Sequence, residues 1–134
     1  MTYRFMLDTN TVSDVIRHPS GIVAQRIVGL PVGSACVSII TAAELRFGAK
    51  KVGSARIWQK ISDFMALVPA LPFEHRAEEV YAEVRAALER DGRPIGPNDL
   101  LIAAQALSLD LTLVTANVRE FARVAGLSVE NWLD

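Results

Sequence analysis

The sequence has 134 residues, of which 51% are hydrophobic and 22% are charged, and its formal net charge is −1. This length predicts one domain, residues 1–134, whose core needs no disulfide bond or structural metal. The composition excludes a disordered chain, and no apolar run reaches the about 18 residues of a membrane-spanning helix. The single cysteine, Cys36, and the lack of a signal-peptide pattern indicate a cytoplasmic protein.

The periodicity of apolar residues predicts alternating strands and helices. In chain order we predict a strand over 3–7, helices over 11–18 and 22–30, a strand over 35–39, helices over 41–51 and 55–67, an extended edge segment over 68–73, helices over 75–91 and 99–109, a strand over 111–115, a helix over 119–125 and a strand over 127–129. Prolines at 69 and 72 restrict the segment that holds them to the edge of a sheet. This alternation predicts an α/β fold with a central parallel sheet covered by helices on both faces.

The charges are unevenly distributed along the chain. Residues 1–60 carry a net charge of +5, and residues 61–134 carry a net charge of −6. Such asymmetry is compatible with a surface that binds a polyanion, although the two halves of a sequence need not form separate faces of the molecule.

Polar residues gather where ligands bind in parallel sheets, at the carboxyl ends of the strands. Asp8 and Asn117 come after predicted strands. Glu44 lies in the first turn of one predicted helix, and Asp99 begins another. Carboxylates that meet at one edge repel one another unless cations lie between them, and oxygen ligands select hard cations such as Mg²⁺ or Mn²⁺.

Each of these residues also has a purely structural interpretation. Asp8 can cap the helix that follows it, and Thr41 with Glu44 has the spacing of a capping box. Asp99 can complement a helix dipole, and Asn117 can serve a turn. The shared predicted location of all four residues is therefore the signal, rather than any one of them.

Other catalytic motifs are missing from the sequence. Cys36 is alone, and His18 and His75 are far apart, which argues against a zinc site. The glycine-containing segment 92–97 lacks the Lys-Ser/Thr of a phosphate-binding loop, and no Gly-x-Ser-x-Gly motif occurs.

The sequence resembles PIN domains and, more narrowly, the VapC-type toxins of prokaryotic type II toxin–antitoxin pairs. The resemblance covers essentially the whole chain. It rests on these segments: Leu7-Asp8-Thr9-Asn10, residues 38–45 with Phe47-Gly48, Gly96-Pro97-Asn98-Asp99, Val114-Thr115-Ala116-Asn117 followed by Arg119-Glu120-Phe121, and the tail 126–132.

The resemblance implies a three-layer fold and an Mg²⁺- or Mn²⁺-dependent endoribonuclease. It assigns Asp8, Glu44 and Asp99 to metal binding, and Asn117 to a fourth catalytic position that is Asp in many members. Metal-activated water would cleave the RNA, leaving a 5′-phosphate and a 3′-hydroxyl. Supporting roles in orienting ligands or waters fall to these polar residues: Thr9, Asn10, Ser38, Asn98 and Thr115. For Ser38 and Thr115, burial with a backbone hydrogen bond is an equally open interpretation.

Basic residues outside the acidic site are candidates for phosphate contacts. They are Arg17, Arg93 and Arg119, with Lys50, Lys51, Arg85 and Arg123 as further candidates. Solvated faces and helix ion pairs are the alternative for each. By resemblance the substrate is RNA, with tRNA favoured.

The expected partners are a VapB-like antitoxin and a second copy of the chain. A set of large apolar residues predicts an exposed patch suited to a homodimer: Tyr3, Phe47, Ile57, Trp58, Phe64 and Met65. An antitoxin segment carrying Arg or Lys is expected beside the acids. The alternatives are a PIN nuclease outside a toxin role and a non-catalytic DNA-binding partner of an antitoxin.

Overall fold

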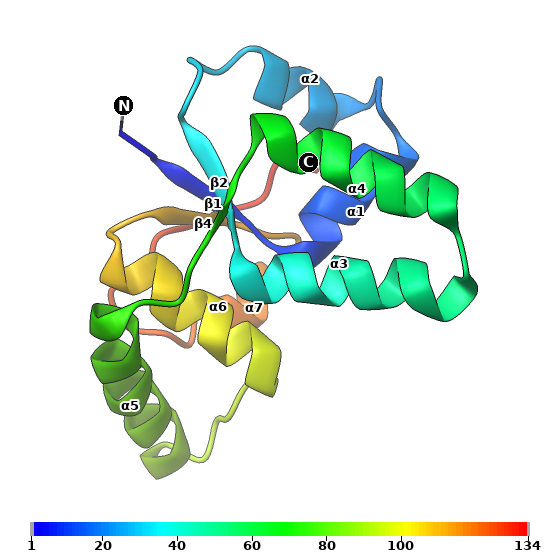
Figure 1. Ribbon diagram of the computed structural model, residues 1–134. Helices are drawn as coiled ribbons and strands as arrows, with labels where there is room; N and C mark the ends of the chain where they lie inside the picture. Colours follow the sequence, from blue (N-terminus) through cyan, green and yellow to red (C-terminus); the bar gives the residue numbers. More distant parts are fainter. Residues whose placement is uncertain (1, 134) are drawn as a thin grey trace.

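A five-stranded parallel sheet lies at the centre of the computed structural model, which describes residues 2–133 (Figure 1). The strands are β1 (Phe5–Leu7), β2 (Ala35–Ser38), β3 (Ala70–Leu71), β4 (Thr112–Val114) and β5 (Val129–Glu130), in the spatial order β3-β2-β1-β4-β5. Leu7 lies beside Val37 on one side and Val114 on the other, so three central strands end at the same edge. The predicted α/β fold is confirmed.

Helices cover both faces of this sheet. They are α1 (Thr9–Arg17), α2 (Ile22–Val28), α3 (Ile39–Val52), α4 (Ala55–Leu67), α5 (His75–Arg90), α6 (Pro97–Ser108) and α7 (Val118–Phe121). Because successive strand residues point to opposite faces, β1 contributes to two cores. Phe5 and Leu7 pack with residues of α1 to α4, whereas Met6 packs with residues of α5, α6 and α7.

The most deeply buried helix is α6, as its apolar sequence predicts. Ile102, Ala103 and Ala106 are fully buried. Its polar Gln105 is buried too, but its amide donates to the carbonyls of Leu71 and Pro72, each at 3.0 Å. These bonds attach α6 to the end of the edge strand β3.

Helix boundaries differ from the prediction where a cap was placed wrongly. Helix α3 begins at Ile39 rather than at 41, because the Ser38 hydroxyl accepts a hydrogen bond from the amide of Ile40 at 3.0 Å. Helix α7 ends at Phe121 rather than at 125, because the chain turns before Gly126, whose φ is +84°.

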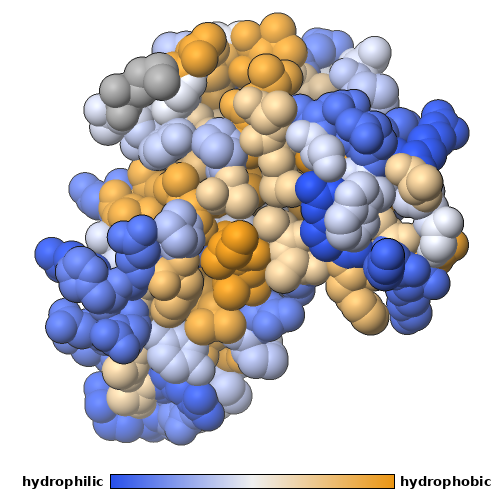
Figure 2. All heavy atoms as spheres, viewed as in Figure 1, coloured by the Kyte–Doolittle hydropathy of each residue, from blue (hydrophilic) through white to orange (hydrophobic). Residues whose placement is uncertain are grey.

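Helices α3 and α4 form an antiparallel hairpin that extends away from the sheet (Figure 1). Gly53 ends α3 in the left-handed conformation, with φ +69°, and the Ser54 hydroxyl caps α4 by accepting from the amide of Ile57. Figure 2 shows apolar residues in the middle of this face of the molecule, between hydrophilic surfaces near α5 and at the hairpin.

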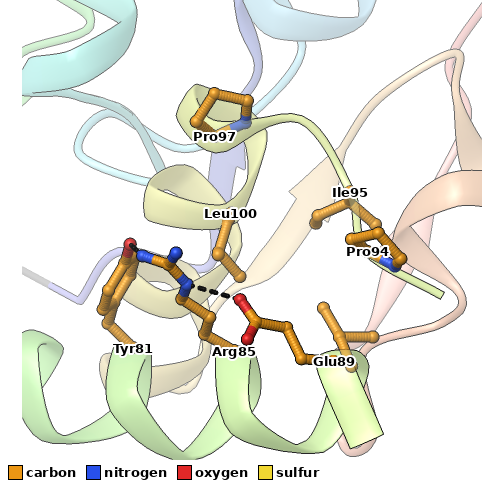
Figure 3. Close-up of a pocket in the computed structure, with 8 residues that line it drawn as sticks. Tyr81, Arg85, Glu89, Pro94, Ile95, Pro97 and Leu100 are labelled. Atoms are coloured by element: carbon orange, nitrogen blue, oxygen red, sulfur yellow. Dashed lines mark hydrogen bonds and ion pairs between the residues drawn. The ribbon is translucent and has the colours of Figure 1, made fainter. Parts of the chain in front are cut away.

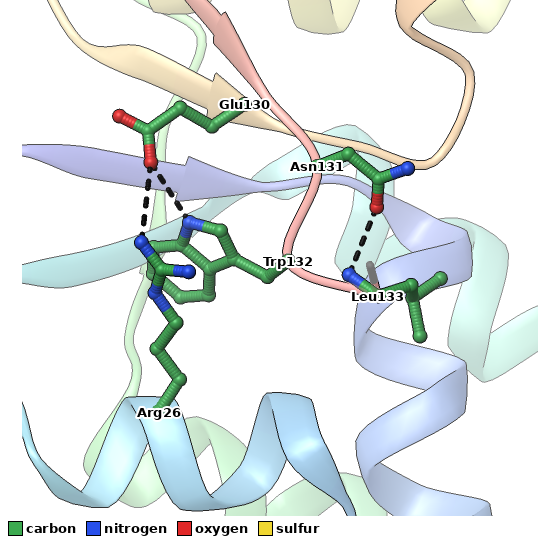
Figure 4. Close-up of polar contacts among 5 residues, drawn as sticks. All are labelled: Arg26, Glu130, Asn131, Trp132 and Leu133. Atoms are coloured by element: carbon green, nitrogen blue, oxygen red, sulfur yellow. Dashed lines mark hydrogen bonds and ion pairs between the residues drawn. The ribbon is translucent and has the colours of Figure 1, made fainter.

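The C-terminal segment is held by Trp132, which is 1% exposed. Its indole N–H donates to Glu130 Oε1 at 2.9 Å, and the guanidinium of Arg26 on α2 lies 4.9 Å from its ring centre (Figure 4). Phe5 meets the same ring edge-on at 5.0 Å. Trp132 therefore connects the tail to both β1 and α2.

Within residues 2–133, no helix is long and apolar enough to cross a bilayer.

Candidate functional site

Asp8 stands immediately after β1 and is 4% exposed. Its Oδ1 accepts a hydrogen bond from the amide of Thr11 at 2.9 Å, so the capping role considered from the sequence is present. The Asp8 amide donates to the carbonyl of Val114 at 3.0 Å, which fixes Asp8 at the junction of β1 and β4. Capping uses one carboxylate oxygen and leaves Oδ2 for another role.

Glu44 lies in the second turn of α3, not in the first. The capping-box interpretation with Thr41 is therefore wrong, because Ser38 already caps this helix. Glu44 instead reaches across to two other elements: the Thr9 hydroxyl donates to its Oε1, and the Asn98 amide donates to its Oε2 at 3.1 Å. These bonds bring together the N-terminal ends of α1 and α6 beside the carboxylate of Glu44.

Asp99 is half-buried in the first turn of α6, and other carboxylates surround it. Burial raises its pKa to about 7, helped by a hydrogen bond with Glu120 and by the charges of Glu120, Asp8 and Glu44. Four carboxyl groups from four parts of the chain therefore interact at one edge of the sheet.

Glu120 is the residue that the sequence reasoning missed as a site residue. It lies in the first turn of α7, and it shares a hydrogen bond with Asp99. The side-chain amide of Asn117 donates to Glu120 Oε2, and the backbone N–H of Gly96 donates to Glu120 Oε1 at 3.3 Å. The available signal was its spacing of three residues from Asn117, which places both on one side of a helical turn.

The predicted supporting residues fall into two groups. Thr9 and Asn98 contact Glu44 directly. Ser38 and Thr115 are fully buried. The Ser38 hydroxyl donates to Gln105 Oε1 at 2.6 Å, and the Thr115 hydroxyl accepts from the backbone N–H of Asn117 at 2.9 Å. Both hydroxyls therefore hold backbone and core in place, which favours their structural interpretation.

Asn10 and the predicted RNA-binding arginines are at the surface. Asn10 and Arg17 line a groove, and the Arg17 Nε donates to the carbonyl of Ser13. Arg93 and Arg119 are exposed, and among residues 2–133 neither forms an ion pair with a carboxylate. All three are available to a phosphate, and Arg17 lines the same groove as Glu44.

The donor set has the chemistry that a hard divalent cation requires. Its members are carboxylate, amide and hydroxyl oxygens, and no Lys or Arg within the described residues forms an ion pair with the four acids. Among residues 2–133, however, no three acidic, histidine or cysteine side chains are already spaced as ligands of one metal ion. The Asp99–Glu120 hydrogen bond occupies oxygens that a cation would need.

A groove of about 370 Å³ leads away from Glu44 between α1, α3 and α4. Polar residues of α1 line the groove, including Thr9, Asn10 and Arg17, and α4 contributes the apolar Ile57 and Ile61. A chain segment with apolar side chains followed by a polar end would match this distribution.

A second hollow, of about 250 Å³, lies between α5 and the segment that leads into α6 (Figure 3). Arg85 donates to Glu89 at 2.8 Å and to the Tyr81 hydroxyl at 2.9 Å, so its charge is already paired. None of the four site carboxylates lines this hollow.

Comparison with known proteins gives consistent results along the chain. The family model "PIN domain" matches residues 5–127. The "tRNA(fMet)-specific endonuclease VapC" of Shigella flexneri is 39% identical over 130 residues, covering 96% of this chain and 98% of that protein. "Ribonuclease VapC2" of Haemophilus influenzae is 40% identical over 132 residues, covering 97% and 98%.

Solved structures agree with these sequence matches. The structure described as DNA-bound VapBC from Salmonella typhimurium has a TM-score of 0.92 and 36% identity, covering 98% of this chain and 99% of that one. Fold and sequence therefore point to the same relatives.

Proposed function

This chain belongs to the PIN-domain family as an endoribonuclease of the VapC toxin type, and from that membership we propose that it cleaves tRNA with a divalent cation held at the carboxylate cluster. The observation that carries the proposal is that the side chains of Asp8, Glu44, Asp99 and Glu120 meet at one edge of the sheet, and the raised pKa of half-buried Asp99 agrees with it. A fold that gathers like charges loses stability unless they bind something positive.

Asp8 and Asp99 would hold the cation, with Glu44 and Glu120 beside them. Mg²⁺ or Mn²⁺ bound there supplies a Lewis acid that neutralises phosphate charge and lowers the pKa of water. The observation that fits this cation is the all-oxygen donor set with no basic partner among the described residues.

The chain's own residues orient the acids and set their protonation. The Thr11 amide fixes the Asp8 carboxylate, and Thr9 and Asn98 hold Glu44. The raised pKa of Asp99 favours its protonated form in the metal-free protein, and a bound cation would favour loss of that proton. Asn117 orients Glu120 by donating to its Oε2, so this neutral residue serves the site without adding a charge.

The substrate proposal of tRNA is supported by the names of the relatives. The Shigella flexneri and Salmonella typhimurium proteins, 39% and 36% identical to this chain, are both described as tRNA(fMet)-specific endonucleases. Over nearly the whole chain, this similarity favours tRNA over other RNA classes.

A VapB-like antitoxin is the proposed partner, and the groove between α1, α3 and α4 is its proposed docking site. The apolar part, with Ile57 and Ile61, would accept apolar side chains. At the other end, an Arg or Lys of the antitoxin would reach Glu44 and offset the repulsion among the acids.

We also propose a homodimer, since Phe47 is 67% exposed and the same hairpin carries the exposed apolar residues Val52 and Trp58.

Brief expression in bacterial cells, followed by sequencing of RNA ends, tests the function. We expect new 5′-phosphate ends at one position in a small set of tRNAs, and none with Asp8→Asn expressed at the same level. New ends confined to mRNA or rRNA would reject tRNA as the substrate, and equal cleavage by Asp8→Asn would reject the site.

A further inference from the structure

The hairpin of α3 and α4 holds a concentration of positive charge that the carboxylate site does not use. Between positions 46 and 62 the sequence has five basic residues and no acidic one: Arg46, Lys50, Lys51, Arg56 and Lys60. We call this segment the basic hairpin. It accounts for most of the positive charge of the first sixty residues, and the fold confines it to one projection of the molecule (Figure 1).

An aromatic ring lies among these charges. Trp58 is 41% exposed, although an indole gains stability from burial. The Arg46 guanidinium lies 4.3 Å from its ring centre and the Lys50 ammonium 5.6 Å. The Arg46 Nη1 also donates to the Trp58 carbonyl at 2.9 Å, which fixes the guanidinium against the ring. The result is a partly exposed ring with two cations over it.

The charges of the basic hairpin are not neutralised by the protein. Within residues 2–133 the ion pairs are Arg26–Glu130 and Arg85–Glu89, and neither involves the hairpin. Lys50, Lys51 and Arg56 are exposed. An anionic ligand would therefore find these cations available without breaking any ion pair within the described part of the chain.

The hollow beside Trp58 and the groove that begins at Glu44 adjoin at one buried residue, Ala49. Trp58 and Lys50 line a hollow of about 540 Å³, and Ala49 lines both this hollow and the groove that begins at Glu44. An RNA strand whose scissile phosphate lies at the acids would pass from the groove into this neighbouring hollow to reach the ring.

We propose that the basic hairpin is an RNA-binding subsite, at which an unpaired base next to the cleavage site stacks on Trp58 while Lys50 and Lys51 contact the backbone phosphates. Stacking on an exposed aromatic side chain combined with cationic phosphate contacts is the chemistry by which proteins bind single-stranded nucleic acid. An acidic protein segment would use the cations but gain little from the flat ring. The inference rests on the proposed ribonuclease function and deepens it.

Binding of a fluorescent tRNA anticodon stem-loop in EDTA, followed by anisotropy, tests the stacking contact. We expect Trp58→Ala to weaken binding about ten-fold, and Trp58→Phe to keep most of the affinity because it keeps a ring. With Mg²⁺, Trp58→Ala should raise KM for tRNA about ten-fold and leave kcat unchanged, since the lost contact is made equally in the ground and transition states.

The salt dependence of binding tests the phosphate contacts with a matched pair of variants. Lys50→Gln/Lys51→Gln and Arg76→Gln/Arg90→Gln each remove two exposed positive charges, the second pair from α5. Only the first should flatten the plot of log affinity against log salt, by about 1.4, because each contact to single-stranded phosphate contributes about 0.7. Equal slopes for the two variants would overturn the proposal.

Two further outcomes separate this subsite from the function on which it rests. If the wild-type chain cleaves tRNA and every hairpin variant binds RNA as tightly as wild type, the subsite alone is rejected. If Trp58→Ala loses self-association or antitoxin binding but keeps its RNA affinity, the surface is a protein interface and the subsite is again rejected. A wild-type chain that binds no RNA would reject the subsite and the proposed function together.

Discussion

At the scale of one residue, Asp99 shows the consequence of gathering acids at the proposed cation site. Its carboxyl group shares a hydrogen bond with Glu120, and such a bond between two acids requires a proton. In the metal-free protein this proton reduces the repulsion among the acids, which a bound cation would reduce instead. Metal-free protein should therefore depend on pH in a way that cation-loaded protein does not.

We predict that the thermal midpoint of the metal-free protein contains a component, due to Asp99, that falls between about pH 4 and pH 7. The pKa of Asp99 rises from its usual value of 3.8 to about 7 on folding, so its contribution to stability is full only below about pH 4. That contribution is lost as pH rises through about 7. Scanning calorimetry in EDTA measures it.

Asp99→Asn should remove this component, and saturating Mg²⁺ should reduce it in the wild-type chain. Glu120→Gln should move the pH at which this component is lost only partly toward lower pH, because burial is the largest cause of the raised Asp99 pKa and Glu120 is the second. An unchanged pH profile in Asp99→Asn would show that another group is responsible.

Glu44 gives a second prediction at this scale. Glu44→Gln should lower cleavage about a hundred-fold or more, while the thermal midpoint changes little. The reason is that a glutamine oxygen can accept from Asn98 while its amide donates to the Thr9 hydroxyl, so both bonds survive without the charge. Thermal denaturation and a tRNA cleavage assay on one preparation measure both effects. A stable variant with full activity would remove Glu44 from the site.

At the scale of secondary-structure elements, apolar periodicity located the helices and strands, but not always their ends. The extended segment 68–73 contains β3 at the edge of the sheet, as its prolines predicted. The first helical residue of α3 was missed because Ser38 and Thr41 are both good caps, and only the backbone decides between them. Glu120 was missed because its role depends on Asp99, 21 positions away in sequence.

The tail gives a stability prediction for an element rather than for the site. Trp132→Ala should lower the free energy of unfolding by about 3–5 kcal/mol, because it removes a buried indole that packs on Phe5 and Arg26. Arg26→Ala should cost less than about 1 kcal/mol, since its ion pair with Glu130 is half-exposed. Urea denaturation distinguishes the two. A Trp132→Ala variant as stable as Arg26→Ala would contradict the packing described here.

At the scale of the whole molecule, the charge asymmetry of the sequence has a structural counterpart only for its positive half, since the basic hairpin holds five of the eight basic residues of positions 1–60 whereas the four acids of the site come from both halves. The acids of the site lie at the sheet edge, and the basic hairpin extends from it on α3 and α4. The expected apolar patch is only partly present: Phe47, Ile57 and Trp58 are exposed. Tyr3, Phe64 and Met65 instead pack against the two cores, because both faces of the sheet are covered.

Assembly gives a prediction at this scale. We expect a homodimer in light scattering at tens of micromolar, and Phe47→Glu should give monomers, because it places a charge on the exposed apolar surface. A monomeric wild-type chain at that concentration would reject the homodimer.

Inhibition by antitoxin should weaken as Mg²⁺ increases, since a basic side chain and the cation compete for the same acids. Inhibition by an antitoxin tail without basic residues would reject that competition.

The central claim is that the carboxylate cluster cleaves tRNA only with a bound divalent cation. Its most direct test is the rate of tRNA cleavage by purified protein in EDTA and after Mg²⁺ is added back, for the wild-type chain and Asp8→Asn. We expect no cleavage in EDTA, recovery with Mg²⁺ for the wild-type chain, and no recovery for folded Asp8→Asn, because an amide binds Mg²⁺ far less well than a carboxylate. Cleavage by the wild-type chain in EDTA, or full recovery in Asp8→Asn, would contradict it.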